Sequence, residues 1–417
     1  MTTEKFVLSC GMEMLVDYMP HLRSVASGLW VKCGSVYEDP SLAGASHFLE
    51  HMLFKGTSHR NSLQIASEME EVGGVLNAFT GKEHTCFYAR SLDEHFSRQL
   101  DLLADMYRNS LLLEEEFARE KNVIIEEINM YEDSPDEVAM DLFTGTIFPR
   151  HPYGPPISGT LESVRNLTSD QLRQHYHKFY TPANTVLSIA GNIEPMLAKE
   201  MAEEKFSGFK GKWQAPDPPI PQTASATAYI HKDTEQSHIC LGFPGIPLGD
   251  DDYYAAAILA NILGGGASSR LFQEVREKRG LAYSAYCYQE AYVKGGYLMA
   301  YAATAPARAE ELTKVIAQQF SLIADNGLTE KEIRQSKDQL KGGLLLSMES
   351  SANVMSKLGR TYLSLGKVYD QDEIVNKLMN VTADDIEKVI KGLIKKDAVV
   401  LAQVGPNEPT RDIRELL

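Results

Sequence analysis

The sequence has few cysteines, a shortage of basic residues and no long apolar run. Its five cysteines are scattered and in no C-x-x-C pair, which indicates free thiols and a reducing compartment. The 41 lysines and arginines are outnumbered by 57 aspartates and glutamates, and the net charge of -16 argues against nucleic-acid binding. No apolar run reaches membrane-spanning length, and residues 1–9 lack the basic start and apolar core of a secretory signal. We therefore expect a cytoplasmic protein with no nucleic-acid or membrane partner.

The length and composition indicate two folded domains. Charged residues make up 24% and apolar residues 43% of the 417 positions, as in globular proteins. A chain of this length suits two domains of about 200 residues each. The segment 208–223 is rich in glycine and proline, so we interpret it as a linker between domains at 1–207 and 224–417.

The two halves contain a repeated segment. Residues 167–192 and 381–406 both carry a threonine-capped helix pattern followed by a valine-rich strand and a glycine. The matching positions keep a constant offset of 214 residues, as between Thr168 and Thr382 or between Gly191 and Gly405. We interpret this repeat as an internal duplication. Alternating apolar runs in hairpin-like pairs, separated by helical patterns, predict an α+β fold in which each half is a mixed, mostly antiparallel sheet covered by helices.

A candidate metal site lies in residues 47–56, HFLEHMLFKG. Residues three and four apart lie on nearly one face of a helix, so His47, Glu50 and His51 would project together. Two imidazoles can bind zinc, and a neighbouring carboxylate can act as a base toward water. If the halves are copies, residues 253–266 correspond to this helix and carry no histidine. The duplication therefore predicts one metal site per chain, in the first half only.

A hydrolytic zinc site needs a third protein ligand. The best candidates are glutamates of the helical pattern at 119–137, where Glu120 and Glu127 share a face and Glu126 is turned by about 100°. A carboxylate beside a buried apolar stripe needs a partner, and a metal cation would supply one. Surface exposure on a solvated helix is the alternative interpretation for these residues.

With these residues in place, the sequence resembles the inverzincin peptidases, a family that includes pitrilysin, insulin-degrading enzyme and mitochondrial processing peptidase. In that family a glutamate follows the H-x-x-E-H motif by some 75 residues, and here 75 residues (52–126) lie between His51 and Glu127. The resemblance covers the whole chain and matches the short, two-domain members. It implies that His47, His51 and Glu127 bind one Zn2+, that Glu50 is the general base toward zinc-bound water, and that Glu120 assists.

The second half has a candidate substrate contact in residues 264–286. Its glycines match no phosphate-binding pattern, and an exposed Arg276 with a half-buried Tyr283 would be unremarkable by itself. The resembled family carries an arginine and a tyrosine at this spacing of seven residues, where they contact the substrate near the zinc. In its two-domain members, paired subunits close a chamber. The resemblance therefore implies a homodimer in which Arg276 and Tyr283 act on the partner subunit's site.

The substrate is expected to be a peptide or unfolded segment bound as an added strand. The resemblance points to Asn77, Ala78 and Thr80 as the strand that receives it, with an ordinary hairpin as the alternative. The acidic balance of the chain makes basic peptides reasonable substrates. We expect His84, in the following turn, to be a surface residue.

Two other functions fit parts of the pattern. A small-molecule zinc lyase of the S-ribosylhomocysteinase type also uses H-x-x-E-H, but it has one domain and completes its site with a cysteine. A catalytically silent assembly subunit is the other alternative, although such proteins usually lose the ligands, and none is missing here.

Overall fold

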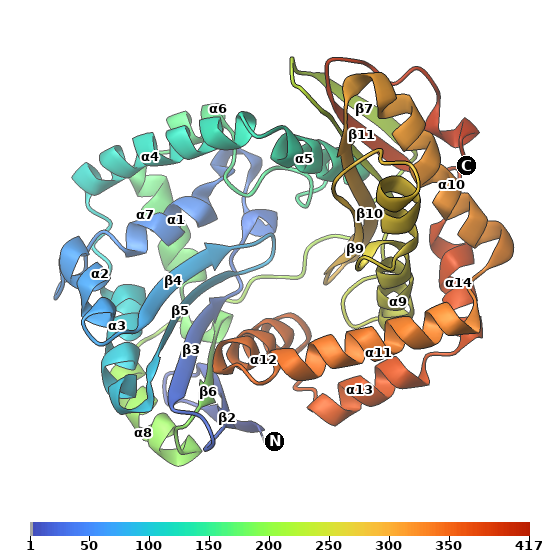
Figure 1. The fold of residues 1–417 in the computed structure, drawn as a ribbon. Helices are drawn as coiled ribbons and strands as arrows, with labels where there is room; N and C mark the ends of the chain where they lie inside the picture. The colour runs from blue at the N-terminus through green and yellow to red at the C-terminus, as the bar shows by residue number, and fades with distance from the viewer. Residues whose placement is uncertain (1–2) are drawn as a thin grey trace. The chain divides into compact units, whose positions relative to one another are not determined.

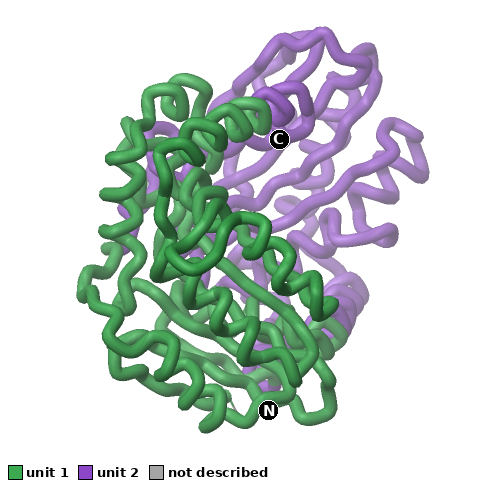
Figure 2. The backbone as a smooth tube through the Cα atoms, turned by 90° about the vertical axis from the view of Figure 1, so that its left-hand side faces the viewer, with its two compact units in different colours: residues 1–128, 156–216, 345–371 green, residues 129–155, 217–344, 372–417 purple. Residues whose placement is uncertain are grey.

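The computed structural model describes residues 3–417, which form two compact units (Figure 1). Unit 1 comprises residues 1–128, 156–216 and 345–371, and unit 2 comprises residues 129–155, 217–344 and 372–417 (Figure 2). Within the described part of the chain, no helix is both long and apolar enough to cross a membrane. The five cysteines of these residues are free, as the sequence predicts, and four of them are buried.

Unit 1 is built on a six-stranded sheet in the order β1-β2-β6-β3-β5-β4. All neighbouring strands are antiparallel except β2 and β6. The strands are β1 (Thr3–Val7), β2 (Glu13–Tyr18), β3 (Ser24–Val31), β4 (Val75–Thr80), β5 (Thr85–Leu92) and β6 (Thr185–Gly191). The helices are α1 (Ala45–Leu53), α2 (Ser62–Glu70), α3 (Phe96–Asn109), α4 (Glu114–Glu132), α6 (Leu161–Asn166), α7 (Ser169–Phe179), α8 (Pro195–Phe206) and α12 (Ser351–Leu365).

Unit 2 is built on a five-stranded sheet in the order β7-β11-β8-β10-β9, in which only β7 and β11 are parallel. The strands are β7 (Ala226–His231), β8 (Ser237–Pro244), β9 (Ala285–Tyr292), β10 (Gly295–Thr304) and β11 (Val400–Gly405). The helices are α5 (Pro135–Ile147), α9 (Tyr253–Gly264), α10 (Ala309–Asn326), α11 (Glu330–Ser347), α13 (Gln371–Asn380) and α14 (Ala383–Leu393).

The two sheets repeat one topology, which confirms the expected α+β fold with an internal duplication. The order β2-β6-β3-β5-β4 in unit 1 matches β7-β11-β8-β10-β9 in unit 2, with the parallel pair in the same place. The repeated helices α7 and α14 both begin with a capping box, at Thr168 and Thr382. Each cap satisfies backbone N–H groups that a helix start leaves free.

The compact units differ from the contiguous domains 1–207 and 224–417, which were predicted on either side of the glycine- and proline-rich linker. Helix α5 precedes the linker yet packs on β8 and β11 of unit 2, and α12 follows it yet packs on β3 and β6 of unit 1. Glycines make the α12 contact close, because a Cβ on Gly359 would lie 2.0 Å from Trp30 Nε1 and one on Gly28 would lie 2.5 Å from Met355 Sδ. The repeat marks matching segments, whereas packing assigns these helices to the other sheet. Segment 208–223 has no regular secondary structure, as expected of a linker.

Candidate metal centre

Helix α1 carries the H-x-x-E-H residues on the flank of a buried stripe. The apolar residues Ala45, Phe48, Leu49, Met52 and Leu53, spaced as on one face of a helix, are all buried in the core of unit 1. Their spacing places the histidines beside the core rather than in it, and the side chains of His47 and His51 remain 13% and 22% exposed. Both imidazoles are thus held by a rigid helix but can still be reached from outside.

His47, His51 and Glu127 converge in unit 1. His47 Nε2 lies 3.7 Å from Glu127 Oε1, and His51 Nε2 lies 3.5 Å from Glu127 Oε2. Each residue offers a ligand atom within 4.8 Å of the others. Tetrahedral bonds of about 2.1 Å would place ligand atoms about 3.4 Å apart, so the donor set fits a zinc ion with small adjustments. Glu126, the alternative on α4, is exposed and outside this cluster.

The two imidazoles are in different electrostatic environments. Burial, together with the neighbouring charge of His51, lowers the pKa of His47 to about 4. Burial also opposes protonation of His51, but the hydrogen bond to Glu120 and the nearby carboxylates outweigh it, so the pKa of His51 is raised. His47 is therefore neutral at physiological pH, which is the form that binds metal.

Glu50 is held by the neighbouring edge strand. Its Oε2 accepts a hydrogen bond of 2.6 Å from Thr80 Oγ1 on β4. Burial raises the pKa of the Glu50 carboxyl, and the Thr80 hydrogen bond opposes this shift. A carboxylate with a raised pKa beside a group of candidate metal ligands is suited to accept a proton.

Glu120 forms a hydrogen bond with the ring nitrogen of His51 that does not face Glu127. Its Oε1 lies 2.8 Å from His51 Nδ1, and its Oε2 lies 2.7 Å from the Lys55 ammonium. The carboxylate is buried, and these two partners hold its pKa below the usual value although burial opposes that shift. Such a carboxylate fixes the tautomer and orientation of a ligating histidine. Lys55 follows His51 by one helical turn, a spacing that could have revealed it from the sequence.

Strand β4 lies at an open edge of the sheet, as a strand that receives a peptide must. The Ala78 backbone N–H donates a 2.8 Å hydrogen bond to Asn77 Oδ1. Helix α1 packs on the same strand. The structure thus brings Asn77, Ala78 and Thr80 next to the motif helix, while their substrate contacts stay a prediction.

Arg276 and Tyr283 form a pair in unit 2. The Arg276 guanidinium lies 4.3 Å from the Tyr283 ring centroid and 4.8 Å from that of Phe272. Arg276 belongs to a short π-helix, Phe272–Glu277, a form often found at functional sites. Tyr283 is 81% exposed rather than half-buried. Tyr283 is open to a ligand and Arg276 is partly exposed, while their role stays a prediction.

The expectation that His84 lies on the surface is wrong. Its side chain is buried, with the ring centroid 5.2 Å from that of Trp30 and 5.9 Å from that of Phe79. Burial and the positive charge of Arg360 lower the pKa of His84 to about 3. The turn sequence gave no sign that two aromatic rings would enclose it, and it is not part of the metal cluster.

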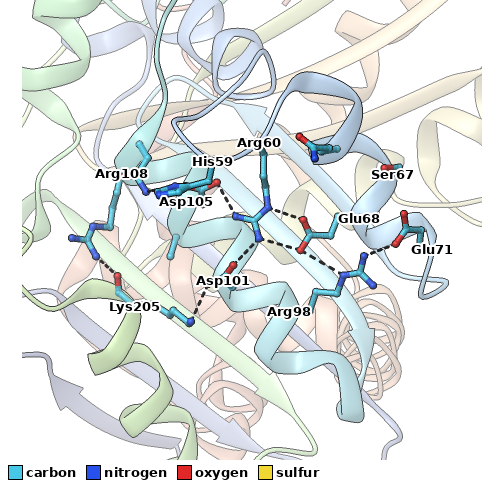
Figure 3. Close-up of a pocket in the computed structure, with 13 residues that line it drawn as sticks. His59, Arg60, Ser67, Glu68, Glu71, Arg98, Asp101, Asp105, Arg108 and Lys205 are labelled. Atoms are coloured by element: carbon cyan, nitrogen blue, oxygen red, sulfur yellow. Dashed lines mark hydrogen bonds and ion pairs between the residues drawn. The ribbon is translucent and has the colours of Figure 1, made fainter.

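A charged hollow of about 590 Å³ is lined mainly by residues of the loop after α1, of α2 and of α3, and by none of His47, His51 and Glu127 (Figure 3). Arg60 donates to Glu68, Asp101 and Asp105, and Asp105 also accepts a 2.7 Å hydrogen bond from Thr57. These ion pairs fasten the loop after α1 to α3. Because the Arg60 guanidinium pairs with these carboxylates, we interpret the network as structural support for the helix that carries the H-x-x-E-H motif.

Family models match most of the chain. The model described as insulinase (peptidase family M16) matches residues 13–161, and the model described as peptidase M16 inactive domain matches residues 166–340. The chain belongs to peptidase family M16. The family resemblance and the fold predicted from the sequence are thereby confirmed.

Relatives in this family are similar over nearly their whole length. An uncharacterized zinc protease of Bacillus subtilis, YmxG, is 41% identical over 97% of this chain and 98% of its own. An uncharacterized zinc protease of Streptomyces coelicolor, SCO5738, is 37% identical over 97% of this chain and 90% of its own.

Solved structures share the fold of this M16 chain. A peptidase M16 inactive domain from Pseudomonas fluorescens has a TM-score of 0.92 at 22% identity, covering 99% of each chain. A protease from Helicobacter pylori has a TM-score of 0.91 at 23% identity, covering 97% of this chain and 99% of its own.

Proposed function

We propose that this M16 family member is a zinc-dependent endopeptidase that cleaves peptides or unfolded segments. The observation that carries the proposal is the convergence of His47, His51 and Glu127, with Glu50 on the same helix. The curated relatives named as zinc proteases support zinc as the metal. We propose one zinc ion per chain.

Zinc bound by these three residues would polarise the scissile carbonyl and lower the pKa of the attacking water. Glu50 would accept a proton from that water and deliver it to the leaving amine. The Thr80 hydroxyl, 2.6 Å from Glu50, orients the carboxylate for this transfer. Glu120 keeps His51 in the orientation that presents Nε2 to the metal.

The peptide would bind along β4 as an added strand. Backbone hydrogen bonds at an open edge give affinity with little demand on sequence. On docking, the Asn77 side chain must release the Ala78 N–H so that the peptide carbonyl can accept from it. Basic peptides are the substrate class that the net charge of -16 favours.

We further propose a homodimer that encloses the substrate. Arg276 and Tyr283 of one subunit would contact the peptide bound at the zinc site of the other. The support is the exposure of Tyr283 and the stacking of the partly exposed Arg276 guanidinium on its ring. Donors aimed at the developing oxyanion would add electrostatic stabilisation.

Zinc content and cleavage of a mixed peptide library test the peptidase proposal. Wild type should bind zinc and cleave, and Glu50→Gln should bind zinc without cleaving. The control is Glu126→Gln, which makes the same change at an exposed position of α4 and should behave as wild type. A folded, zinc-loaded, dimeric wild type that cleaves nothing would refute the proposal.

A mixing experiment tests the shared site. Glu50→Gln and Arg276→Ala chains are each expected to be inactive, and their mixture should regain activity because a mixed dimer has one site with all groups intact. Activity that stays absent in verified mixed dimers would contradict action across subunits.

A further inference from the structure

Glu38 lies between two short 3-10 helices, Ser35–Tyr37 and Pro40–Leu42, and its side chain contacts the first turn of α1. Its Oε2 accepts a 2.8 Å hydrogen bond from the Gly44 N–H, and its Oε1 accepts a 2.6 Å hydrogen bond from the Ser46 N–H. One carboxylate thus binds two backbone N–H groups at the start of the helix that carries the metal motif. Burial raises the pKa of Glu38 to about 7, although both hydrogen bonds favour the ionised form.

The helix needs this external partner because its own cap residue has no side chain. Gly44 is the N-cap with a φ of 94°, and it makes no side-chain cap. A Cβ at Gly44 would lie 2.5 Å from the Ser158 carbonyl oxygen, so an ordinary capping residue does not fit. The first N–H groups of a helix have no partner within the helix. Glu38 supplies that partner from six residues upstream.

His47, the candidate metal ligand nearest this cap, is also the histidine whose second ring nitrogen has no hydrogen bond to hold it among the described residues. His51 Nδ1 is held by Glu120, but His47 Nδ1 is buried without a hydrogen-bond partner among residues 3–417. Ligating histidines usually donate their second N–H to a fixed acceptor, which sets the ring orientation. With no hydrogen bond at Nδ1 to fix its ring, His47 depends more strongly on the backbone of the first turn, which Glu38 holds at Gly44 and Ser46.

We infer that Glu38 is a positioning residue of the metal centre, which holds the first turn of α1 and thereby places His47 as a ligand. Its carboxylate also brings negative charge to the positive end of the helix, which favours a cation bound in that turn. The inference rests on the proposed zinc site. It concerns metal binding, so it can be tested without measuring peptide cleavage.

The test compares zinc dissociation constants, measured by competition with a chelator, for wild type, Glu38→Gln and Glu38→Ala. Glu38→Gln keeps the shape but can accept from only one of the two N–H groups, and it should weaken zinc binding about tenfold or more. Glu38→Ala should weaken it at least as much. The matched control, Glu70→Gln, removes the same charge from an exposed position of α2 and should bind zinc as wild type does.

Circular dichroism of the metal-free proteins separates positioning from general stability. The expected result is weaker zinc binding by Glu38→Gln at a temperature at which it is fully folded, with a changed visible spectrum of Co2+ in the same site. Zinc binding within twofold of wild type by folded Glu38→Gln would overturn the inference, even if its melting temperature fell. A folded wild type that binds no zinc would instead overturn the proposed function and this inference with it.

Discussion

Replacing Gly359 by alanine should destabilise unit 1, although alanine is the better helix former. A Cβ at this position of α12 would lie 2.0 Å from Trp30 Nε1, whereas carbon atoms in contact are about 3.5–4.0 Å apart. Trp30 is fully buried and cannot move aside, and its indole donates a 2.9 Å hydrogen bond to Ser188 Oγ. Overpacking costs about 1–3 kcal/mol and a lost hydrogen bond about 1 kcal/mol, and alanine returns about 1 kcal/mol of helix propensity. The expected net loss is about 1–3 kcal/mol.

Urea denaturation followed by tryptophan fluorescence measures this loss. Trp30 and Trp213 are the chain's two tryptophans, and both lie in unit 1, so the signal reports unfolding of that unit. The control is Gly343→Ala in α11, where a Cβ would meet nothing within 4 Å. That change should raise stability by about 0.5–1 kcal/mol, measured by circular dichroism. A Gly359→Ala protein as stable as wild type would refute the assignment of α12 to the face of this sheet.

Four further changes test the metal centre. Glu127→Gln should weaken zinc binding by at least tenfold in a chelator competition, whereas Glu126→Gln should leave it unchanged; equal effects would contradict the ligand assignment. Lys55→Met should weaken zinc binding about tenfold because the carboxylate behind His51 loses its ammonium partner, and Lys55→Arg should restore most of it; an unchanged affinity in Lys55→Met would refute this role. Thr80→Val should lower kcat about tenfold with little change in KM, and Thr80→Ser should retain activity; a change in KM alone would assign Thr80 to substrate binding instead. Zinc affinity should fall as the pH drops below neutrality, because the raised pKa of His51 keeps a proton on the ring that metal binding must remove; affinity independent of pH in that range would contradict this.

Local patterns predicted much of the fold. The stripe from Ala45 to Leu53 identified α1, and the two copies of the threonine-capped helix identified the duplication that the matching strand orders confirm. The metal cluster was also accessible, because a helical period places His47 and His51 on one face. The choice of Glu127 over Glu126 came from the family spacing, and α4 turns only the former toward the histidines.

Two features that the sequence did not reveal, the packing of α5 and α12 and the enclosure of His84, depend on segments far apart in the chain. Periodicity can show that a helix has an apolar face, but it does not show which sheet that face covers, as for α5 and α12. Glu38 could not be recognised as a cap because capping signals are read at the N-cap position itself, and here that position is a glycine. The burial of His84 was not predicted because its enclosure depends on Trp30, more than fifty residues earlier.

Unit 2 keeps the contact between two helices that is found at the candidate metal centre, but it lacks the histidines and glutamates. Where α1 and α4 are joined by His51 and Glu120, the corresponding helices α9 and α11 are joined by Asn261, whose Nδ2 donates a 2.9 Å hydrogen bond to Ser336 Oγ. Glu127 follows Glu120 by seven residues, and the residue seven positions after Ser336 is a glycine. The Asn261 amide and the Ser336 hydroxyl hold the two helices together, and Gly343 has no side chain. These three residues offer no ligand set for zinc. Replacing Asn261 alone by histidine would therefore create no second site, and three changes would be needed to restore the ligands. This contrast supports the proposal of one metal ion per chain, because the positions of unit 2 that correspond to His47, His51 and Glu127 carry neither a histidine nor a carboxylate.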